Sequence, residues 1–418
     1  MNILILHVRK NKLPSHVLNA LLAEHNLTVI TEPGHEQVYP SDVSICLVAD
    51  ARNIEIVRKV AYEQMAIHHF DYIITPFELA QTVGAYLRSY FGLPGTDFDT
   101  ANNFANKYVM KRRFVSADIP TAPHGIAYGL ADVARVGRDI GWPVVIKPIM
   151  GGGSMDVVIL DDATTLADFM ESPAAQSILS LDIPLIVERF YKLVAEYHCD
   201  GIVHNGEVQF AAPATYLSPM LNCPNNRNGS YFLSADHPDY EVIKNLHARA
   251  AIALGLKSGV THMEFLRTEE GILAGEIACR PAGGGIPDAI KLGFGIDIWQ
   301  AYLDTSLGKA PKIEPVPQAG IVINYQLPVK SGLITHLSSR DELAALPNVL
   351  RVDMLKHEGD VVPEKFNSSY STGQVYLTAS SEDDIEPIIE QIVSQYRLEV
   401  RPVVSLETNV SRQEGRWS

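Results

Sequence analysis

Apolar strands alternate with amphipathic helices through the first ninety or so residues, and no other feature of the sequence restricts the fold as strongly. We expect strands at NILILHV, LTVIT, VSICLVA and DYIITP. The segments between them carry apolar residues at helical spacing: SHVLNALLAEHN, NIEIVRKVAYEQM and ELAQTVGAYLRSYF. Strands that alternate with helices form a parallel sheet covered by helices. Because no G-x-G-x-x-G follows the first strand, the dinucleotide-binding fingerprint is absent.

Length and composition exclude several classes of protein. At roughly 100–200 residues per domain, 418 residues predict two to four domains. No run approaches the eighteen or so apolar residues of a membrane span, and the start MNILILHVRKNK lacks the charge order of a signal peptide. Four cysteines without CxxC spacing argue against a zinc site and a disulfide framework, so we expect a cytoplasmic protein. The net charge of −15 disfavours nucleic-acid binding.

The rest of the chain reads as a linker, a helix, paired strands and a mixed tail. Residues 92–97 (GLPGTD) form the expected linker, and one helix is expected over TANNFANKYVMKRRFVSAD. Turns at 205–206 (Asn-Gly) and 270–271 (Glu-Gly) predict hairpins, the first more strongly than the second. The Asn-rich segment 221–232 is expected to be an exposed loop. The tail is expected to hold the strands IVINYQLP, NVLRVDML and GQVYLTA and the helix EDDIEPIIEQIVSQYRL.

The stretch WPVVIKPIMGGGSMDV combines a lysine with a glycine run. Lys147 ends an apolar strand, and three glycines and Ser154 follow. A glycine run exposes backbone N–H groups to an anion, and a lysine adds a point charge suited to phosphate. The alternative is a hairpin tip whose lysine extends into solvent. The order differs from the Walker pattern, in which the lysine follows the glycines.

The stretch THMEFLRTEEGILAGEIACR carries two glutamates on a predicted hairpin. Glu264 and Glu276 are expected on one face of a partly buried sheet, where two like charges are costly without a cation between them. Mg²⁺ prefers carboxylate oxygens and is often held by one or two of them. The alternative is a pair of edge glutamates balanced by Arg267 and Arg280.

Arg280 follows on the same predicted strand, four residues after Glu276 and ahead of the loop PAGGGI. A guanidinium there is suited to a transferred phosphoryl group or an oxyanion, and the backbone N–H groups of the loop could contact the same anion. The alternative is a salt bridge from Arg280 to Glu276.

Taken in order, these motifs resemble the ATP-grasp superfamily from about residue 100 to 310. The resemblance implies an α/β chain with a Rossmann-like parallel-sheet domain (1–95), a two-lobed α+β ATP-grasp domain (96–312) and a mixed α/β tail domain (313–418). The small lobe would span about 115–190 and the large lobe about 191–312.

The resemblance also implies a role for each site residue. The nucleotide phosphates would be held by two lysines and a mobile loop: Lys107, Lys147, Gly151, Gly152, Gly153 and Ser154. The chain from Glu188 to Tyr191 would be the hinge at the adenine edge, and Glu196 would bind ribose. Glu264 and Glu276 would ligate one or two Mg²⁺ ions, with Mn²⁺ as a substitute. Arg280, Lys147 and Gly284 would act on the reacting groups.

One departure narrows the resemblance. Many members of the superfamily have a metal-binding Asn two residues after the second glutamate, where this chain has Ala278. The pattern E-x-A-x-R before a glycine run resembles the L-amino-acid ligases of antibiotic pathways, which make dipeptides from ATP and amino acids and release ADP and phosphate. Alternatives are a D-alanine–D-alanine ligase, a biotin-carboxylase-like enzyme, a purine-pathway carboxylase, or a nucleotide-binding regulatory protein without catalysis.

The resemblance leaves the substrates and the assembly open. Candidate specificity residues are His198, Asp200 and the 221–232 segment. The alternative for each is that it simply belongs to the surface of a hairpin or loop. An acidic pocket would favour a cationic amino acid. Large enzymes are often symmetric, which leaves a homodimer open.

Overall fold

The N-terminal residues form the parallel sheet that the sequence predicts. Its strands, in the order β3-β2-β1-β4 and all parallel, are β1 (Asn2–His7), β2 (Asn26–Thr31), β3 (Ser44–Leu47) and β4 (Tyr72–Ile74). Ile3, Leu4 and Ile5 in β1 are fully buried, because helices cover both faces of the sheet. These helices are α1 (Ser15–Glu24), α2 (Ile54–His68) and α3 (Gln81–Phe91), with 3₁₀ turns at Glu36–Val38 and Glu78–Ala80.

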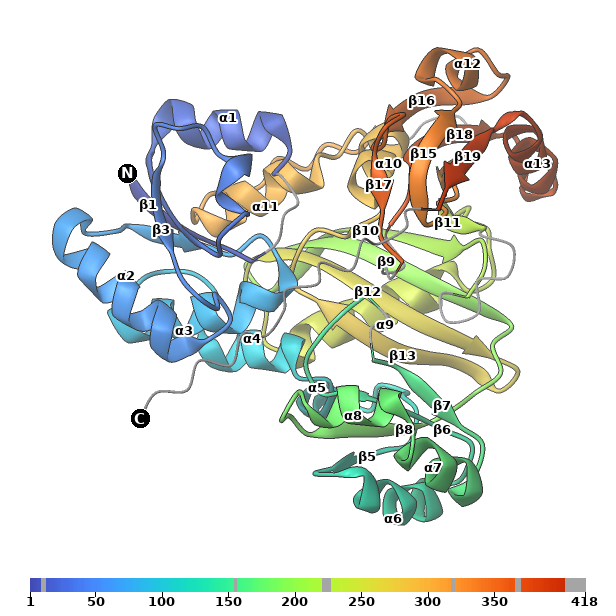
Figure 1. Cartoon of the computed structure of the whole chain (residues 1–418), viewed down its shortest axis with the longest axis horizontal. Coiled ribbons are helices and arrows are strands. Elements are labelled where there is room, and N and C mark those ends of the chain that lie inside the picture. The colour runs from blue at the N-terminus through green and yellow to red at the C-terminus, as the bar shows by residue number, and fades with distance from the viewer. Residues whose placement is uncertain (9–12, 154–155, 220–226, 317–319, 365–369, 403–418) are drawn as a thin grey trace, which may run out of the picture.

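The structure is a computed structural model that describes residues 1–8, 13–153, 156–219, 227–316, 320–364 and 370–402. In Figure 1 the N-terminal sheet lies on the left, a small lobe at the bottom, and a long antiparallel sheet between them and the C-terminal strands at the upper right. No helix in the described ranges is both long and apolar enough to cross a bilayer.

The predicted single helix after the linker is wrong: two helices replace it. These are α4 (Phe98–Ala105) and α5 (Lys107–Ser116), and Asn106 interrupts them with extended backbone (φ −91°, ψ 103°). The Asn106 side chain accepts a hydrogen bond from the Val109 amide, so it caps α5, a role for which Asn is strongly preferred. Lys107 therefore becomes the first residue of a new helix.

The small lobe is a four-stranded antiparallel sheet in the order β5-β8-β6-β7. Its strands are β5 (His124–Ala127), β6 (Val144–Pro148), β7 (Val158–Leu160) and β8 (Leu185–Arg189). Helices α6 (Leu130–Ile140), α7 (Ala163–Met170) and α8 (Pro173–Leu179) bury an apolar core against the sheet. The glycine run 151–153 connects β6 to β7, as the sequence predicts.

The main sheet has eight strands in the order β13-β12-β9-β10-β11-β14-β18-β16. The bounds are β9 (Ala195–His204), β10 (Glu207–Tyr216), β11 (Asn228–Phe232), β12 (Gly259–Thr268), β13 (Gly271–Ala278), β14 (Ile321–Gln326), β16 (Val349–Met354) and β18 (Gly373–Ala379). The predicted loop at 221–232 is therefore wrong over 228–232, which is an internal strand. Residues 220–226 lie outside the described ranges. Strands β14, β18 and β16 belong to this sheet, although they lie in the predicted tail domain (313–418). The sheet therefore does not mark a boundary at residue 312, and the three-domain division stays a prediction.

The remaining elements complete the large lobe and the tail. They are α9 (Tyr240–Ala253), α10 (Ile286–Phe294), α11 (Ile298–Ser306), β15 (Gly332–Leu337), α12 (Arg340–Ala344), β17 (Val361–Val362), a 3₁₀ turn (Glu382–Asp384), α13 (Ile385–Gln395) and β19 (Leu398–Arg401). Strands β17, β15 and β19 form a separate three-stranded sheet. Helix α11 packs on the N-terminal domain, so that one apolar core joins this domain to the large lobe (Figure 1).

Both predicted hairpins are present, although the second turns at Glu269 and Glu270, one residue earlier than predicted. The first packs on a buried histidine. Asn205 and Gly206 have positive φ angles (55° and 79°), as a tight turn between β9 and β10 requires. Further along β9, Gly201 lies against His247 of α9, and a Cβ at Gly201 would come within 2.4 Å of its ring. His247 Nε2 bonds Thr261 Oγ1 at 2.7 Å. Burial lowers the pKa of His247 to about 4.

We expect this neutral histidine to make the fold sensitive to acid. Its pKa in the unfolded chain is about 6.5, so the unfolded chain takes up the proton first as the pH falls from 6.5 toward 4. The stabilisation is complete above pH 6.5 and is lost as the pH falls toward 4. Urea unfolding at pH 7 and pH 4.5 should therefore show a smaller stability difference in His247→Gln than in the wild type. Equal differences would contradict a neutral, buried His247.

Candidate active site

Five charged side chains form one continuous chain of ion pairs between the two lobes. Lys111 Nζ lies 3.0 Å from Glu188 Oε2, and Lys147 Nζ lies 2.9 Å from Glu188 Oε1. Lys147 Nζ also lies 2.6 Å from Glu276 Oε1, and Lys107 Nζ lies 3.2 Å from Glu276 Oε2. Of the predicted site residues, Lys107, Lys147, Glu188 and Glu276 are therefore in direct contact.

The charges in this chain hold one another ionised. Burial would raise the pKa of Glu276, but Lys107 and Lys147 outweigh it and lower the pKa to about 2. Burial would likewise lower the pKa of Lys147, but Glu188 and Glu276 keep it above its ordinary value. Only at Lys111, which has no exposed surface, does burial outweigh the carboxylates and lower the pKa. Three lysines face two glutamates, so the site can accept a further anion.

The glycine run closes over this chain of charges. Lys107 Nζ donates to the Gly151 carbonyl at 2.5 Å, and the Lys107 amide donates to the Ile149 carbonyl at 2.8 Å. The loop lies close to Glu78: a Cβ at Gly152 would meet its carboxylate at 2.9 Å, so a larger residue there would require the Glu78 side chain to shift. Gly153 has a left-handed φ of 71°. Ser154, predicted to belong to the same loop, lies outside the described residues.

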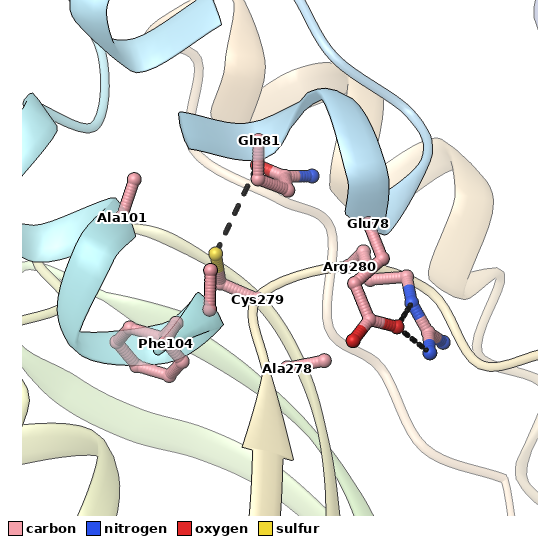
Figure 2. Close-up of a pocket in the computed structure, with 8 residues that line it drawn as sticks. Glu78, Gln81, Ala101, Phe104, Ala278, Cys279 and Arg280 are labelled. Atoms are coloured by element: carbon pink, nitrogen blue, oxygen red, sulfur yellow. Dashed lines mark hydrogen bonds and ion pairs between the residues drawn. The ribbon is translucent and has the colours of Figure 1, made fainter. Parts of the chain in front are cut away.

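Arg280 pairs with Glu78, a residue of the N-terminal domain that the sequence did not indicate. Glu78 Oε2 accepts from Arg280 Nη2 at 2.6 Å and from Nε at 3.1 Å (Figure 2). The alternative salt bridge from Arg280 to Glu276 is therefore wrong. Arg267, the other arginine considered as a counter-ion, pairs with Asp239 instead.

A small pocket lies beside this pair, between α3, α4 and the end of β13 (Figure 2). Apolar side chains line much of it, and the Glu78–Arg280 pair belongs to its lining. The lining residues are Glu78, Gln81, Ala101, Phe104, Ala105, Ala278, Cys279 and Arg280. Burial raises the pKa of the Cys279 thiol to about 11, so this thiol is not a nucleophile at neutral pH.

Glu264 lies on the strand next to Glu276, as predicted, and a bulge brings the two together. The register of β12 and β13 shifts between Met263 and Phe265, so that residues 275 and 276 both face Glu264. Gly275 occurs at the bulge because a Cβ there would lie 2.7 Å from the Glu264 carbonyl oxygen.

A buried polar cluster adjoins Glu264 on the same face of the sheet. His198 and Asp200 of β9 lie directly opposite Glu264 and His262 of β12. Asp200 accepts from His198 Nδ1 at 2.7 Å and from His262 Nδ1 at 3.0 Å. Burial would lower the pKa of His262, but Asp200 outweighs it and raises the pKa to about 9. Tyr216 donates to Glu264 Oε1 at 3.2 Å.

The PAGGGI loop leads into a helix N-terminus. Gly284 and Gly285 have left-handed φ angles of 62° and 83°, and α10 begins at the next residue. A helix N-terminus presents free N–H groups and a partial positive charge. Asn324 of β14 fixes the loop, because its Nδ2 donates to the Gly284 carbonyl at 2.6 Å.

The predicted adenine hinge, Glu188 to Tyr191, covers the end of β8 and the start of the crossing to β9. The main chain of Glu188 is paired on both sides, with His124 of β5 and Val145 of β6, and its side chain points to the lysines. The Glu188 side chain is therefore engaged with the lysines, and its contact with the adenine edge stays a prediction. Tyr191 lies beyond the end of β8, where the chain crosses to β9, and the Arg189 guanidinium lies 5.5 Å from the centre of its ring. Glu196 is buried on β9.

The donor set fits a hard divalent cation. Glu264 and Glu276 both keep partly exposed carboxylates, and the pKa of each lies below its ordinary value, so both are ionised at neutral pH. Carboxylate oxygens in this number suit Mg²⁺, which keeps several waters or phosphate oxygens.

Known proteins resemble the chain over nearly its whole length, although no protein-family model matches it. The L-arginine-specific L-amino acid ligase of Bacillus subtilis is 29% identical over 375 residues, 89% of this chain and 91% of that protein. The crystal structure of an L-amino acid ligase from Bacillus licheniformis has a TM-score of 0.76, with 20% identity, and covers 96% of this chain and 98% of that one. The chain is an ATP-grasp ligase.

This ATP-grasp ligase also shares its fold with more distant enzymes. The biotin carboxylase domain of the Hydrogenobacter thermophilus 2-oxoglutarate carboxylase, solved with MgADP and bicarbonate, has a TM-score of 0.70 at 16% identity, covering 95% of this chain and 90% of that one. The predicted superfamily, fold class and enzyme class are thus confirmed.

The sequence analysis did not identify three residues of this site: Lys111, Glu78 and His262. Lys111 comes one helical turn after Lys107, and that i, i+4 spacing was an available signal. His262 comes two residues before Glu264 and so shares its face of a strand. Glu78 gave no signal, since its partner lies 202 positions away.

We expect Glu188→Gln to destabilise the ATP-grasp ligase by about 3–5 kcal/mol, because Lys111 would stay buried without a counter-charge. Urea denaturation at neutral pH measures this. The matched control is Glu55→Gln, which removes an exposed pair with Arg58 and should have a small fraction of that effect. Equal effects in the two variants would show that the buried chain of charges contributes little.

Proposed function

We propose that this ATP-grasp ligase joins two L-amino acids into a dipeptide, with ATP as the phosphoryl donor and ADP and phosphate as products. The observation that carries the proposal is the Glu78–Arg280 pair beside the lysine–glutamate chain. It sets one negative and one positive group in the lining of a small pocket, near the lysines that we propose for phosphate binding. An amino acid carries the complementary pair of charges. The similarity to the L-arginine-specific ligase over 89% of the chain supports the same activity.

The lysine–glutamate chain suits phosphoryl transfer. When ATP binds, its phosphates replace Glu276 as the partner of Lys107 and Lys147. Glu188 keeps its ion pair with Lys147 and so holds that lysine in position. Glu264 and Glu276 would hold Mg²⁺, which neutralises phosphate charge when bound. Tyr191 and Glu196 would contact the nucleoside, and the main chain at Gly151 to Gly153 would cover the phosphates. Positioning and electrostatics of this kind account for most of the catalysis in phosphoryl transfer.

The second half of the site suits the acyl group. The carboxylate of the first amino acid attacks the γ-phosphorus, the bond to the β–γ bridging oxygen breaks, and an acyl phosphate and ADP form. The amine of the second amino acid then attacks the acyl carbon, and phosphate leaves. Arg280 and the N–H groups at the start of α10 stabilise the anionic oxygens of both steps. Closure of the glycine loop excludes water, which would hydrolyse the acyl phosphate.

The Glu78 carboxylate gives the pocket its preference for an amine-bearing substrate. The ammonium group of a bound amino acid would pair with Glu78 in place of Arg280. Substrate binding would therefore break the Glu78–Arg280 pair and let Arg280 turn to the acyl phosphate. Bicarbonate has no ammonium and could not make this exchange, which disfavours a carboxylase. A cationic amino acid remains our expectation for one substrate. We also propose that the protein is cytoplasmic and forms a homodimer, without nucleic-acid or membrane partners.

The test is incubation of the protein with ATP, Mg²⁺ and all twenty L-amino acids, with phosphate release and product masses read together. We expect amino-acid-dependent phosphate release and a mass equal to two amino acids minus one water. Phosphate release with bicarbonate alone would instead indicate a carboxylase. Nucleotide binding without turnover of any acid and amine pair would indicate a regulatory protein.

Two substitutions should stop turnover without unfolding the chain. Glu276→Gln should abolish ADP formation, because it removes a metal ligand and the partner of both lysines. Arg280→Lys should lower the turnover number by about 100-fold or more, since an ammonium cannot make the bidentate contact. Circular dichroism reports the fold, and Arg113→Lys on the exposed side of α5 is the matched control. Wild-type rates in a folded Arg280→Lys would make Arg280 a structural residue.

A further inference from the structure

His262 occupies a position at the metal site that no part of the proposed function uses. It lies directly opposite Ala278 across β12 and β13, two residues before Glu264 on the same strand. Alternation along a strand therefore sets His262 and Glu264 on one face, and the cross-strand pairing adds Ala278 to that face. The methyl group of Ala278 offers no ligand atom, so the donor nearest to it across the strands is an imidazole.

Asp200 fixes the orientation of this imidazole. It is buried, with 1% of its surface exposed, and its Oδ1 accepts from His262 Nδ1 at 3.0 Å. A carboxylate bonded to one ring nitrogen of a histidine is the usual support for a metal ligand, because it keeps that nitrogen protonated and leaves the other nitrogen to the metal, which displaces its proton on binding. In His262 that other nitrogen is Nε2.

His262 Nε2 faces Glu264 at a distance suited to a shared cation. It lies 3.7 Å from Glu264 Oε1, which is too long for a hydrogen bond. Two ligand atoms that each lie about 2.1 Å from one divalent cation are separated by this distance at an angle of about 120° at the cation. Tyr216 OH, which donates to Glu264 Oε1, lies 3.5 Å from the same nitrogen and holds the carboxylate in place.

We propose that His262, through Nε2, supplies a nitrogen ligand to the divalent cation held by Glu264. The inference rests on the proposed function, because that cation is the one that accompanies ATP. Imidazole favours transition metals over Mg²⁺, so the site should prefer Mn²⁺ to a degree that two carboxylates alone would not give. His262 thus sets metal preference as well as metal affinity.

A cation inside the cluster of His198, Asp200 and His262 is the competing placement, since potential ligand atoms of these three residues lie within 4.8 Å of one another. There the atoms that face each other are the two Nδ1 groups, and both already donate to Asp200. A cation in that position would have to displace both hydrogen bonds. The open side of His262 is the Nε2 side, toward Glu264.

Pulsed EPR of Mn²⁺ bound with a non-hydrolysable ATP analogue tests the proposal. We expect nuclear modulation from a directly coordinated ¹⁴N in the wild type, and its replacement by the ¹⁵N pattern when the protein is labelled with ¹⁵N-histidine. Mn²⁺ that is bound with the nucleotide but shows no histidine coupling overturns the proposal. Failure of Mn²⁺ and nucleotide to bind at all would instead contradict the proposed function. Because the labelled wild type decides the result, the test does not depend on a variant that folds.

Two variants then assign the nitrogen. His262→Gln should abolish the coupling and weaken Mn²⁺ binding by about 10-fold or more, with a smaller change for Mg²⁺. His198→Gln is the matched control, because it removes the neighbouring ring of the same cluster and should leave the coupling intact. Loss of the coupling in His198→Gln but not in His262→Gln would place the cation inside the cluster and overturn the assignment to His262.

Discussion

The pairing of Glu276 with Lys107 and Lys147 is the interaction on which the site depends, because it joins elements from both lobes. Lys147 belongs to β6 of the small lobe, whereas Glu276 belongs to β13 of the main sheet. Lys107 begins α5, whose apolar residues Met110 and Phe114 are part of the core of the large lobe. Beneath them, Glu188 and the fully buried Lys111 add a second layer that keeps Lys147 in place. The excess of one lysine over the glutamates makes this cluster suited to binding an anion, in addition to joining the two lobes.

The site lies where all parts of the chain converge. The N-terminal domain contributes Glu78, the small lobe contributes Lys147 and the glycine loop, and the large lobe contributes the two glutamates that we propose as metal ligands. The tail contributes Asn324, which fixes the PAGGGI loop from β14. Continuation of the main sheet through β11 into β14 explains how a strand so late in the sequence reaches the active site. A small rearrangement in any of these parts would therefore alter the position of Arg280 or of the loop beside it.

Sequence reasoning succeeded where local pattern determines structure. The parallel N-terminal sheet, the hairpin at Asn205-Gly206 and the lysine ahead of the glycine run follow from periodicity and turn chemistry. It failed where contacts between distant residues decide. Glu78 meets Arg280 only because the N-terminal domain packs on the large lobe, and residues 228–232 become a strand only because β10 and β14 pair with them. Asn106 lies between these cases, since its preference for a helix cap was visible but competed with a helical pattern on both sides.

The lysine–glutamate chain also implies a competition between Glu276 and the nucleotide for the same two lysines. In this structure Glu276 occupies both lysines that would bind the nucleotide phosphates, and Lys107 holds the glycine loop through Gly151. ATP bound as we propose would have to displace the Glu276 carboxylate before its phosphates reach the lysines, and its apparent affinity would be reduced by the fraction of molecules in which Glu276 holds them. That competition favours the fully charged triphosphate over weaker anions such as inorganic phosphate. Glu276 would thus have two roles: it would bind the metal during turnover, and between turnovers it would select for nucleotides by competing with weaker anions.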